Sequence, residues 1–298
     1  MPYLPPEKGF LGLAKGEAVP MAKAKAIVVP FGCEQTVSYG TGTAKGPAAI
    51  LKASHQVELF DEEFWSEPVY EYGVATLKAF PIQRPMSKAV AQLEGIVAKV
   101  LEEGKFPLTL GGEHGLSPGA IRAVLKNYPK LSILHFDAHA DLRDGYGKHF
   151  YSHAAAVRRM LELGDIRIVS CGIRNISKGE IPYLESNRER IHIFWGKDRL
   201  SYDPRKMIDL LGDRPVYLSF DVDGFDSSLM PMTGTPEPGG LFWEDVMAIL
   251  REAGRRLNII GADVVELAPS KWNHAPDFLT AKLCYKILSW SLAKKKPA

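Results

Sequence analysis

Two short segments of the sequence carry acidic and imidazole side chains at a spacing of two residues. Residues 137–141 read Asp-Ala-His-Ala-Asp, and residues 221–223 read Asp-Val-Asp. Side chains two apart on an extended chain point to the same side, so each segment aims its polar groups at one place. A third segment, Gly-Gly-Glu-His at 111–114, adds an imidazole after a tight turn that its glycines permit. Carboxylates gathered in this way repel one another, and one or two divalent cations would reverse that balance.

These segments supply six candidate metal ligands: His114, Asp137, His139, Asp141, Asp221 and Asp223. Four carboxylates and two imidazoles form a hard, oxygen-rich set, which favours Mn²⁺ over a zinc site built on thiolates. With bridging carboxylates, such a set suits two ions about 3.5 to 4 Å apart. Each segment alone is often only a turn in which an Asp accepts from a backbone N–H group. Because three of them follow three predicted strands, we interpret them together as a metal site.

The elements that position these segments are predicted from hydrophobic periodicity. Apolar, β-branched runs alternate with helical patterns, as in a mostly parallel sheet covered by helices on both faces. About eight strands are expected, at residues 24–31, 56–60, 106–110, 131–136, 166–171, 191–195, 216–220 and 259–265. Helices are expected at residues 87–103, 118–127, 153–163, 203–211, 243–256 and 277–293. The three polar segments follow strands directly, at the carboxyl edge where sites form in such sheets.

The chain of 298 residues, with 46% hydrophobic residues and a net charge of +2, has an ordinary globular composition. No repeat or linker interrupts it, so a single α/β domain is predicted over 1–298. Its three cysteines are widely spaced and form no CxxC pair, which predicts buried thiols: Cys33, Cys171 and Cys284.

The sequence also restricts location and partners. It has neither a signal-like N-terminus nor a stretch of 18 apolar residues, so we expect a cytoplasmic protein without a membrane partner. The near-neutral charge implies no nucleic-acid partner, and the lysines at 294–296 are interpreted as a solvated helix end.

Five segments resemble, in order and spacing, the signatures of the ureohydrolase family, which contains arginases and agmatinases. They are GGEHGLSPG (111–119), FDAHADLRD (136–144), SFDVDGFD (219–226), TGTPEPGGL (233–241) and GADVVELAP (261–269). A sixth, TVSYGTGTAKGPAAI (36–50), is similar to an agmatinase stretch, so the resemblance extends along nearly the whole chain. It implies a three-layer α/β/α fold with a mostly parallel sheet, two Mn²⁺ ions per subunit and a homo-oligomer, either a trimer or a hexamer.

The resemblance also implies how the six residues divide between the two ions. One ion would be bound by His114, Asp137, Asp141 and Asp221. The other would be bound by His139, Asp137, Asp221 and Asp223. In this arrangement Asp137 and Asp221 bridge the two ions.

Three catalytic residues are implied by the same motifs. Glu266 matches the glutamate that pairs with a substrate guanidinium, Asp141 the ligand that passes a proton to the leaving amine, and His153 a proton-shuttle histidine. A guanidinium is resonance-stabilised and stays protonated, so it needs a strong nucleophile held close. A bound metal lowers the pKa of water from about 15.7 towards 7, which supplies hydroxide at neutral pH.

Alternative interpretations of these residues are structural. Glu266 would otherwise be a surface carboxylate, and His153 the first residue of a helix capped by Ser152. In this chain Ala154 follows His153 where the family commonly has Gly. The other histidines have no partner motif and are expected to be packing or surface residues: His55, His135, His149, His192 and His274.

The motifs favour agmatine as the substrate, which would be split into putrescine and urea. Its far end would be read by loops 144–150 and 175–181. Arg143 either reaches a substrate carboxylate or pairs with Asp144.

Arginase, guanidinobutyrase, guanidinopropionase and formimidoylglutamase activities stay open. A deacetylase-like amidohydrolase with a single zinc is disfavoured, because a mononuclear site does not need His114, Asp141 and Asp223 together. A non-catalytic homologue is disfavoured, because neither a ligand nor the guanidinium partner is missing.

Overall fold

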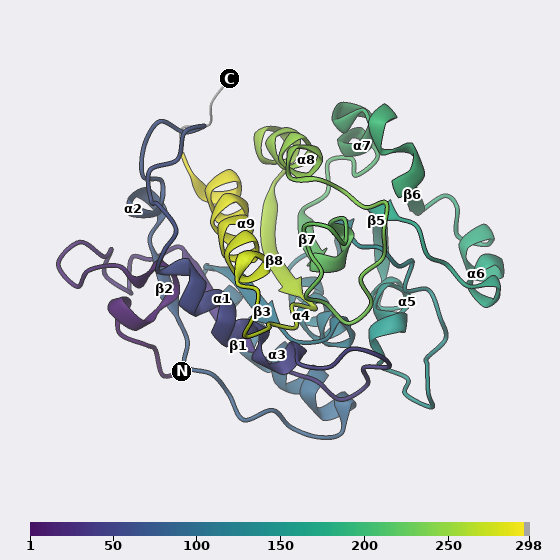
Figure 1. Ribbon diagram of the computed structural model, residues 1–298, viewed down its shortest axis with the longest axis horizontal. Coiled ribbons are helices and arrows are strands. Elements are labelled where there is room, and N and C mark those ends of the chain that lie inside the picture. Colours follow the sequence, from purple (N-terminus) through teal and green to yellow (C-terminus); the bar gives the residue numbers. More distant parts are fainter. Residues whose placement is uncertain (295–298) are drawn as a thin grey trace.

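The computed structural model describes residues 1–294 and is built on one eight-stranded sheet (Figure 1). The strands are β1 (Ala26–Phe31), β2 (Val74–Thr76), β3 (Phe106–Gly111), β4 (Lys130–Phe136), β5 (Asp165–Ile173), β6 (Ile191–Trp195), β7 (Val216–Asp221) and β8 (Ile259–Val265). Their order is β2-β1-β3-β8-β7-β4-β5-β6, and every pair of neighbours is parallel. Two lysines of the C-terminal run, at 295 and 296, lie outside the described residues.

Helices connect the strands and cover both faces of the sheet. They are α1 (Gly46–Ser54), α2 (Val69–Tyr72), α3 (Met86–Glu102), α4 (Ser117–Leu125), α5 (Ala156–Leu161), α6 (Ile181–Glu185), α7 (Pro204–Asp209), α8 (Trp243–Arg256) and α9 (Ala275–Leu292). Within residues 1–294, no helix has both the length and the apolar character needed to cross a bilayer.

The sheet separates two hydrophobic cores, because successive side chains of a strand face opposite sides. In β1, Ala26 and Val28 pack into the core shared with α1, α7, α8 and α9, whereas Ile27 and Val29 pack into the core beneath α3, α4 and α5. Figure 1 shows α8 and α9 lying over one face of the sheet. The three-layer α/β/α prediction is therefore confirmed, and the three cysteines are buried free thiols, as expected.

Seven of the eight predicted strands overlap observed strands, and one prediction is wrong. Residues 56–60 form no strand, since only Val57 of this stretch is buried and its neighbours turn to solvent. The strand that completes the sheet is β2, a three-residue segment that pairs with β1 and begins after Gly73 at a positive φ of 67°. The helix α1 was also not predicted. It begins at Gly46-Pro47, where proline suits the first turn of a helix.

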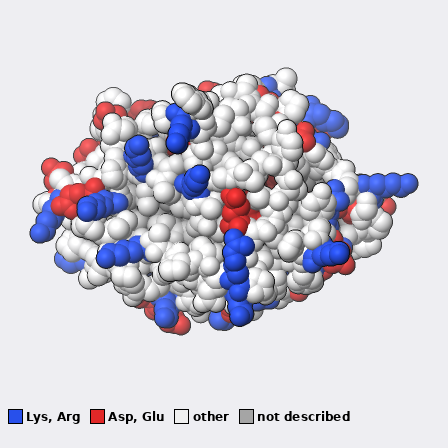
Figure 2. Space-filling model, turned by 60° about the horizontal axis from the view of Figure 1, so that its bottom comes forward, with Lys and Arg blue, Asp and Glu red and all other residues white. Residues whose placement is uncertain are grey.

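The carboxyl ends of the strands meet at one edge of the sheet, and the three polar segments lie there. They follow β3, β4 and β7, which together with β8 form the four central strands. Figure 2 turns the lower side of the molecule in Figure 1 towards the viewer, where a small acidic group lies near the middle among scattered basic side chains.

Candidate active site

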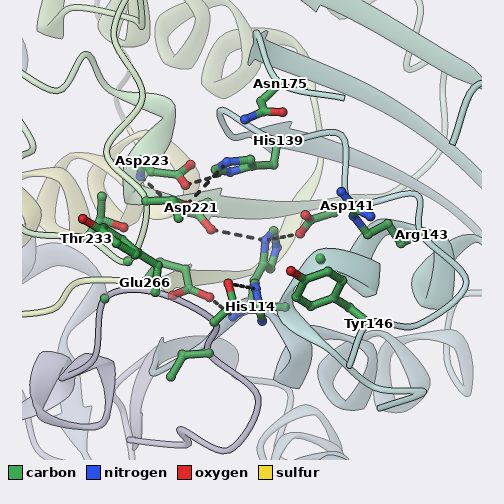
Figure 3. A pocket seen from close by; sticks show the side chains of 18 of the residues that line it. His114, His139, Asp141, Arg143, Tyr146, Asn175, Asp221, Asp223, Thr233 and Glu266 are labelled. Atoms are coloured by element: carbon green, nitrogen blue, oxygen red, sulfur yellow. Dashed lines mark hydrogen bonds and ion pairs between the residues drawn. The ribbon is translucent and has the colours of Figure 1, made fainter. Parts of the chain in front are cut away.

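All six candidate ligands converge at the carboxyl edge. A cavity of about 280 Å³ is lined by five of them together with Glu266 and His153. Figure 3 shows the five ligand candidates and Glu266 pointing toward one another from segments that follow different strands. The sixth, Asp137, is fully buried directly behind the cavity wall, in contact with both imidazoles of the set.

His114 faces three carboxylates at once. Its Nδ1 lies 3.1 Å from Asp137 Oδ2, 3.2 Å from Asp141 Oδ2 and 3.4 Å from Asp221 Oδ2. This Nδ1 is buried and makes no hydrogen bond of good geometry. His114 Nδ1 therefore faces three carboxylate oxygens without a hydrogen bond to satisfy it.

The hydrogen bond of the other ring nitrogen of His114, Nε2, determines which nitrogen carries the proton and which has a lone pair. The Ser219 hydroxyl donates to Asp263 Oδ1 at 2.7 Å, so it accepts from His114 Nε2 at 3.1 Å. In the neutral ring this leaves a lone pair on Nδ1, facing carboxylate oxygens. A lone pair among carboxylates is repulsive unless a cation lies between them, so the residues fit a divalent metal ion.

His139 forms a second group around the same shared carboxylate. Its Nδ1 lies 3.0 Å from Asp223 Oδ2 and 3.5 Å from Asp137 Oδ1, and the three residues could hold a metal ion. The His139 side chain is 25% exposed, on the side of the cavity. The two imidazoles, His114 and His139, therefore contact different oxygens of the same carboxylate, Asp137.

Backbone N–H groups hold one oxygen of each of three aspartates. Asp223 N donates to Asp221 Oδ1 at 2.9 Å, Ala138 N to Asp223 Oδ1 at 2.9 Å, and His139 N to Asp137 Oδ1 at 2.6 Å. The spacing of two residues therefore does more than place side chains on one side. It also lets the turn after each strand fix the carboxylates that face the centre.

The charges in this cluster are mutually unfavourable without a cation. Burial and the neighbouring Asp137 raise the pKa of Asp141 to about 7. Burial, followed by Asp223 and Asp137, raises the pKa of Asp221 well above its usual range. Burial lowers the pKa of His139, but the nearby Asp223 and Asp137 outweigh it and bring that pKa to about 12. Without a cation, bound protons offset the negative charge of these carboxylates. Divalent cations would offset it more completely.

Glu266 is buried beside this cluster rather than on the surface. Its side chain is 7% exposed, and its Oε1 accepts from the backbone N–H of His114 at 2.6 Å. Burial raises the pKa of Glu266 well above its usual range. Glu266 and Asp141 both adopt positive φ values, of 68° and 52°, and such costly conformations are concentrated at functional sites. The surface interpretation of Glu266 is wrong.

His153 lines the same cavity from the start of the segment that leads into α5. Ser152 Oγ accepts from Ala154 N at 3.2 Å, so the predicted cap is present and does not exclude a role for the imidazole. The ring lies between two hydroxyls, with Thr36 Oγ1 3.3 Å from Nδ1 and Ser38 Oγ 3.4 Å from Nε2. Burial lowers the pKa of His153 to about 4, so the ring is neutral at pH 7.

Sequence reasoning missed the residues that support the cluster from behind. His135 is fully buried, with Nε2 3.0 Å from Asp137 Oδ2 and Nδ1 3.0 Å from Ser170 Oγ, so it is a polar partner of Asp137 and not a simple packing residue. The spacing of two residues before Asp137 was a usable signal. The Ser219 to Asp263 pair joins two strands far apart in sequence, and no local pattern indicates it.

The two loops predicted to read the substrate line part of the cavity. Tyr146 comes from loop 144–150, and Asn175 and Glu180 come from loop 175–181. The Arg143 guanidinium lies 5.1 Å from the Tyr146 ring centroid, and its Nε is 3.9 Å from Glu180 Oε2. Pairing of Arg143 with Asp144 is wrong, since that carboxylate instead contacts two arginines of α5.

Comparison with known proteins agrees with this geometry. A sequence profile described as "Arginase family" matches residues 24–289. The chain belongs to the arginase family. It is therefore a hydrolytic enzyme of the ureohydrolase class, and members of this family depend on metal ions.

Similar arginase-family proteins include two curated bacterial enzymes. The N(1)-aminopropylagmatine ureohydrolase of Synechocystis sp. is 34% identical over 285 residues, which cover 92% of each chain. The agmatinase of Bacillus subtilis is 34% identical over 275 residues, covering 89% of this chain and 90% of that one.

Solved structures of the family share the fold. The agmatine ureohydrolase of Thermoplasma volcanium is 29% identical, with a TM-score of 0.83 over 95% of this chain and 94% of that one. The arginase from Medicago truncatula is 26% identical, with a TM-score of 0.79 over 90% and 88% of the respective chains.

Proposed function

We propose that this enzyme hydrolyses agmatine to putrescine and urea at a centre of two Mn²⁺ ions. The observation that carries the proposal is the pair of imidazoles on either side of Asp137, each facing further carboxylates at 3.0 to 3.4 Å. Bound Mn²⁺ would lower the pKa of water and so provide a nucleophile strong enough for a guanidinium carbon at neutral pH.

We assign one imidazole to each of the two proposed ions and divide the carboxylates accordingly. We assign His114, Asp137, Asp141 and Asp221 to one ion. We assign His139, Asp137, Asp221 and Asp223 to the other. The set contains nitrogen and oxygen donors and no thiolate, which suits Mn²⁺.

Glu266 is proposed to bind and orient the guanidinium. Its Oε1 is held by the His114 N–H group, so its Oε2 is the atom available to the cavity. A cationic guanidinium beside this buried carboxylate favours its ionised form, and a planar N–H pair fits carboxylate geometry. The side chain therefore fixes the direction from which the carbon can be attacked.

Two further residues are proposed to move protons. Asp141, which faces the cavity beside His114, can take a proton from the nucleophile. His153 Nε2 can deliver a proton to the leaving amine nitrogen as the C–N bond breaks. Both lie at the cavity wall, where a substrate that touches Glu266 would be within reach.

The charge at the cavity mouth supports a substrate with an amine at its far end. Glu237 Oε1 lies 4.0 Å from His139 Nε2 and accepts from Asn175 Nδ2 at 2.5 Å, beside the cavity. This carboxylate could bind an amine, whereas the arginine among the described lining residues, Arg143, is already opposed by Glu180. N(1)-aminopropylagmatine, which appears in the name of one relative, also has an amine at its far end and is the alternative substrate.

The test is urea release by Mn²⁺-loaded protein from agmatine, N(1)-aminopropylagmatine, arginine and guanidinobutyrate, with an EDTA-stripped control. We expect metal-dependent release from agmatine. Release from another compound would replace the substrate and keep the chemistry, and silence with every compound would refute the proposal. His139→Ala should reduce turnover by orders of magnitude, whereas His192→Ala, a matched change in β6 outside the cavity, should not.

The Glu237→Gln variant tests the amine-tail argument separately. Its KM should rise for agmatine and stay unchanged for guanidinobutyrate if the carboxylate reads an amine. A single domain over 1–298, assembly into a trimer or hexamer, and a cytoplasmic location stay predictions.

A further inference from the structure

The imidazole of His153 is held by residues outside the proposed metal ligands. Its Nδ1 lies 3.3 Å from Thr36 Oγ1, and its backbone N–H donates to that same oxygen at 3.3 Å. The remaining nitrogen, Nε2, lies 3.4 Å from Ser38 Oγ at the cavity wall. Thr36 and Ser38 sit in the loop after β1, far from His153 in sequence.

The Thr36 hydroxyl has a single proton, and its direction can be assigned. Thr36 Oγ1 donates to Glu113 Oε2 in a short hydrogen bond. The same oxygen must then accept from both groups of His153, the backbone N–H and Nδ1. Nδ1 therefore carries the ring proton, and Nε2 keeps its lone pair toward the cavity.

Glu113 is placed to fix that direction. The carboxylate is completely buried and accepts from Gln35 N at 2.5 Å and from Thr36 N at 3.0 Å, in addition to the Thr36 hydroxyl. Its own backbone N–H donates to Cys33 O at 2.8 Å, which ties the turn after β3 to the loop after β1. Every polar contact described for this side chain is one in which it accepts, so the Thr36 proton has no competing direction.

We propose that Glu113 and Thr36 are positioning residues that hold His153 as the Nδ1–H tautomer with Nε2 directed into the cavity. This inference rests on the proposed function for its consequence, because Nε2 is the atom that would carry the proton to the leaving amine. In one cycle the proton that Asp141 takes from the nucleophile passes through cavity water to Nε2, which releases it to the amine nitrogen as the C–N bond breaks. The ring then returns to its neutral Nδ1–H form.

The first experiment replaces the Thr36 hydroxyl by a methyl group. In Thr36→Val, kcat for urea release should fall about 10- to 100-fold, a partial loss of the roughly 100- to 10,000-fold that a general acid contributes. KM and the manganese content should stay within twofold of the original protein, and Thr36→Ser should restore kcat. Thr43→Val is the matched control, since Thr43 is also a buried threonine between β1 and α1, and its hydroxyl binds Glu34 away from the cavity.

A double-mutant cycle separates positioning from a general loss of structure. With His153 replaced by Asn, Thr36→Val should cause little further loss, because the two residues act through one group. An equal loss in both backgrounds would overturn the inference, as would a kcat for Thr36→Val within twofold of the original.

A readout without turnover keeps the inference independent of the proposed reaction. Nitrogen-15 NMR of histidine-labelled protein, with the His153 signals assigned from the His153→Asn spectrum, should show the Nδ1–H tautomer in the original protein. Thr36→Val should shift this ring toward the other tautomer or a mixture. An Nε2–H tautomer in the original would refute the inference even if urea is released. Absence of urea release with the expected tautomer would refute the proposed function alone.

Discussion

Replacing Glu266 by Gln tests how the substrate is held without changing side-chain size. The amide oxygen can still accept from the His114 N–H group, as Oε1 does at 2.6 Å. The amide NH₂ then takes the place of Oε2 at the cavity. A guanidinium presents only N–H donors, so a donor would face a donor where the original protein has a charge-assisted pair.

The size of the effect follows from the burial of Glu266, which is 7% exposed. Removing one partner from a buried, hydrogen-bonded charge pair costs about 2 to 5 kcal/mol. A mid-range loss of about 3 kcal/mol corresponds to a decrease of about 100-fold in kcat/KM. Metal content should not change, because Glu266 is outside the six proposed ligands.

The assay combines steady-state urea release with metal analysis of the same sample. Glu34→Gln is the matched control, since Glu34 also accepts backbone N–H groups and does not line the cavity. We expect the control to keep kcat/KM within a few fold. A decrease of less than fivefold in Glu266→Gln would refute the assigned role, and loss of manganese would mean that Glu266 supports the metal centre instead.

Three further predictions concern the surroundings of the site. Ser219→Ala removes the acceptor of His114 Nε2 and should weaken manganese binding about 10- to 100-fold, as measured by metal titration; unchanged affinity would contradict the tautomer assigned to His114. Lys286→Met removes the ammonium that lies 2.8 Å from the buried Asp61 carboxylate. It should lower the free energy of unfolding by about 3 to 5 kcal/mol, as measured by denaturant titration. A decrease below about 1 kcal/mol would show that the pair is dispensable. Burial lowers the pKa of His153 to about 4, below the unfolded value near 6.5, so its contribution to stability is present above pH 6.5 and is lost as the pH falls toward 4. Between pH 7 and pH 5, the free energy of unfolding of the metal-free protein should therefore fall by at most about 2 kcal/mol more than that of its His153→Asn variant, as measured by denaturant titration. Equal decreases in the two proteins would show that the pKa of the ring is not lowered by folding.

The sequence was sufficient for the parts of the fold that have strong local patterns. Long buried strands such as β4 and β8, and the amphipathic helix α8, were predicted close to their observed bounds because their periodicity is sustained. The three-residue strand β2 has too few residues to show any period, and its pairing with β1 depends on the tertiary structure. The run at 56–60 was predicted as a strand in place of β2 because it contains Val57 and two other apolar residues.

The same division applies to the site. The six candidate ligands could be found because they follow strands at a spacing of two residues, which is a local property. Partners that approach from another strand or loop could not be found, as with Ser219 and Asp263 on neighbouring strands and Thr36 beside Glu113. Their contacts span 44 and 77 positions along the chain, so only the folded arrangement brings them together.

The order of the strands has a consequence for how enzymes of this kind diverge. The six polar residues follow β3, β4 and β7, and Glu266 follows β8, so all stand on the four central strands. A shift of one residue in the pairing register of any of these strands would turn its side chains away from the site. Each of the four strands is paired with a neighbouring strand on both sides, which fixes this register. The loops 144–150 and 175–181 follow β4 and β5 and are largely exposed, so an insertion there lengthens mainly surface chain. Descendants of one ancestor can therefore exchange one guanidino compound for another while inheriting the hydrolytic machinery intact.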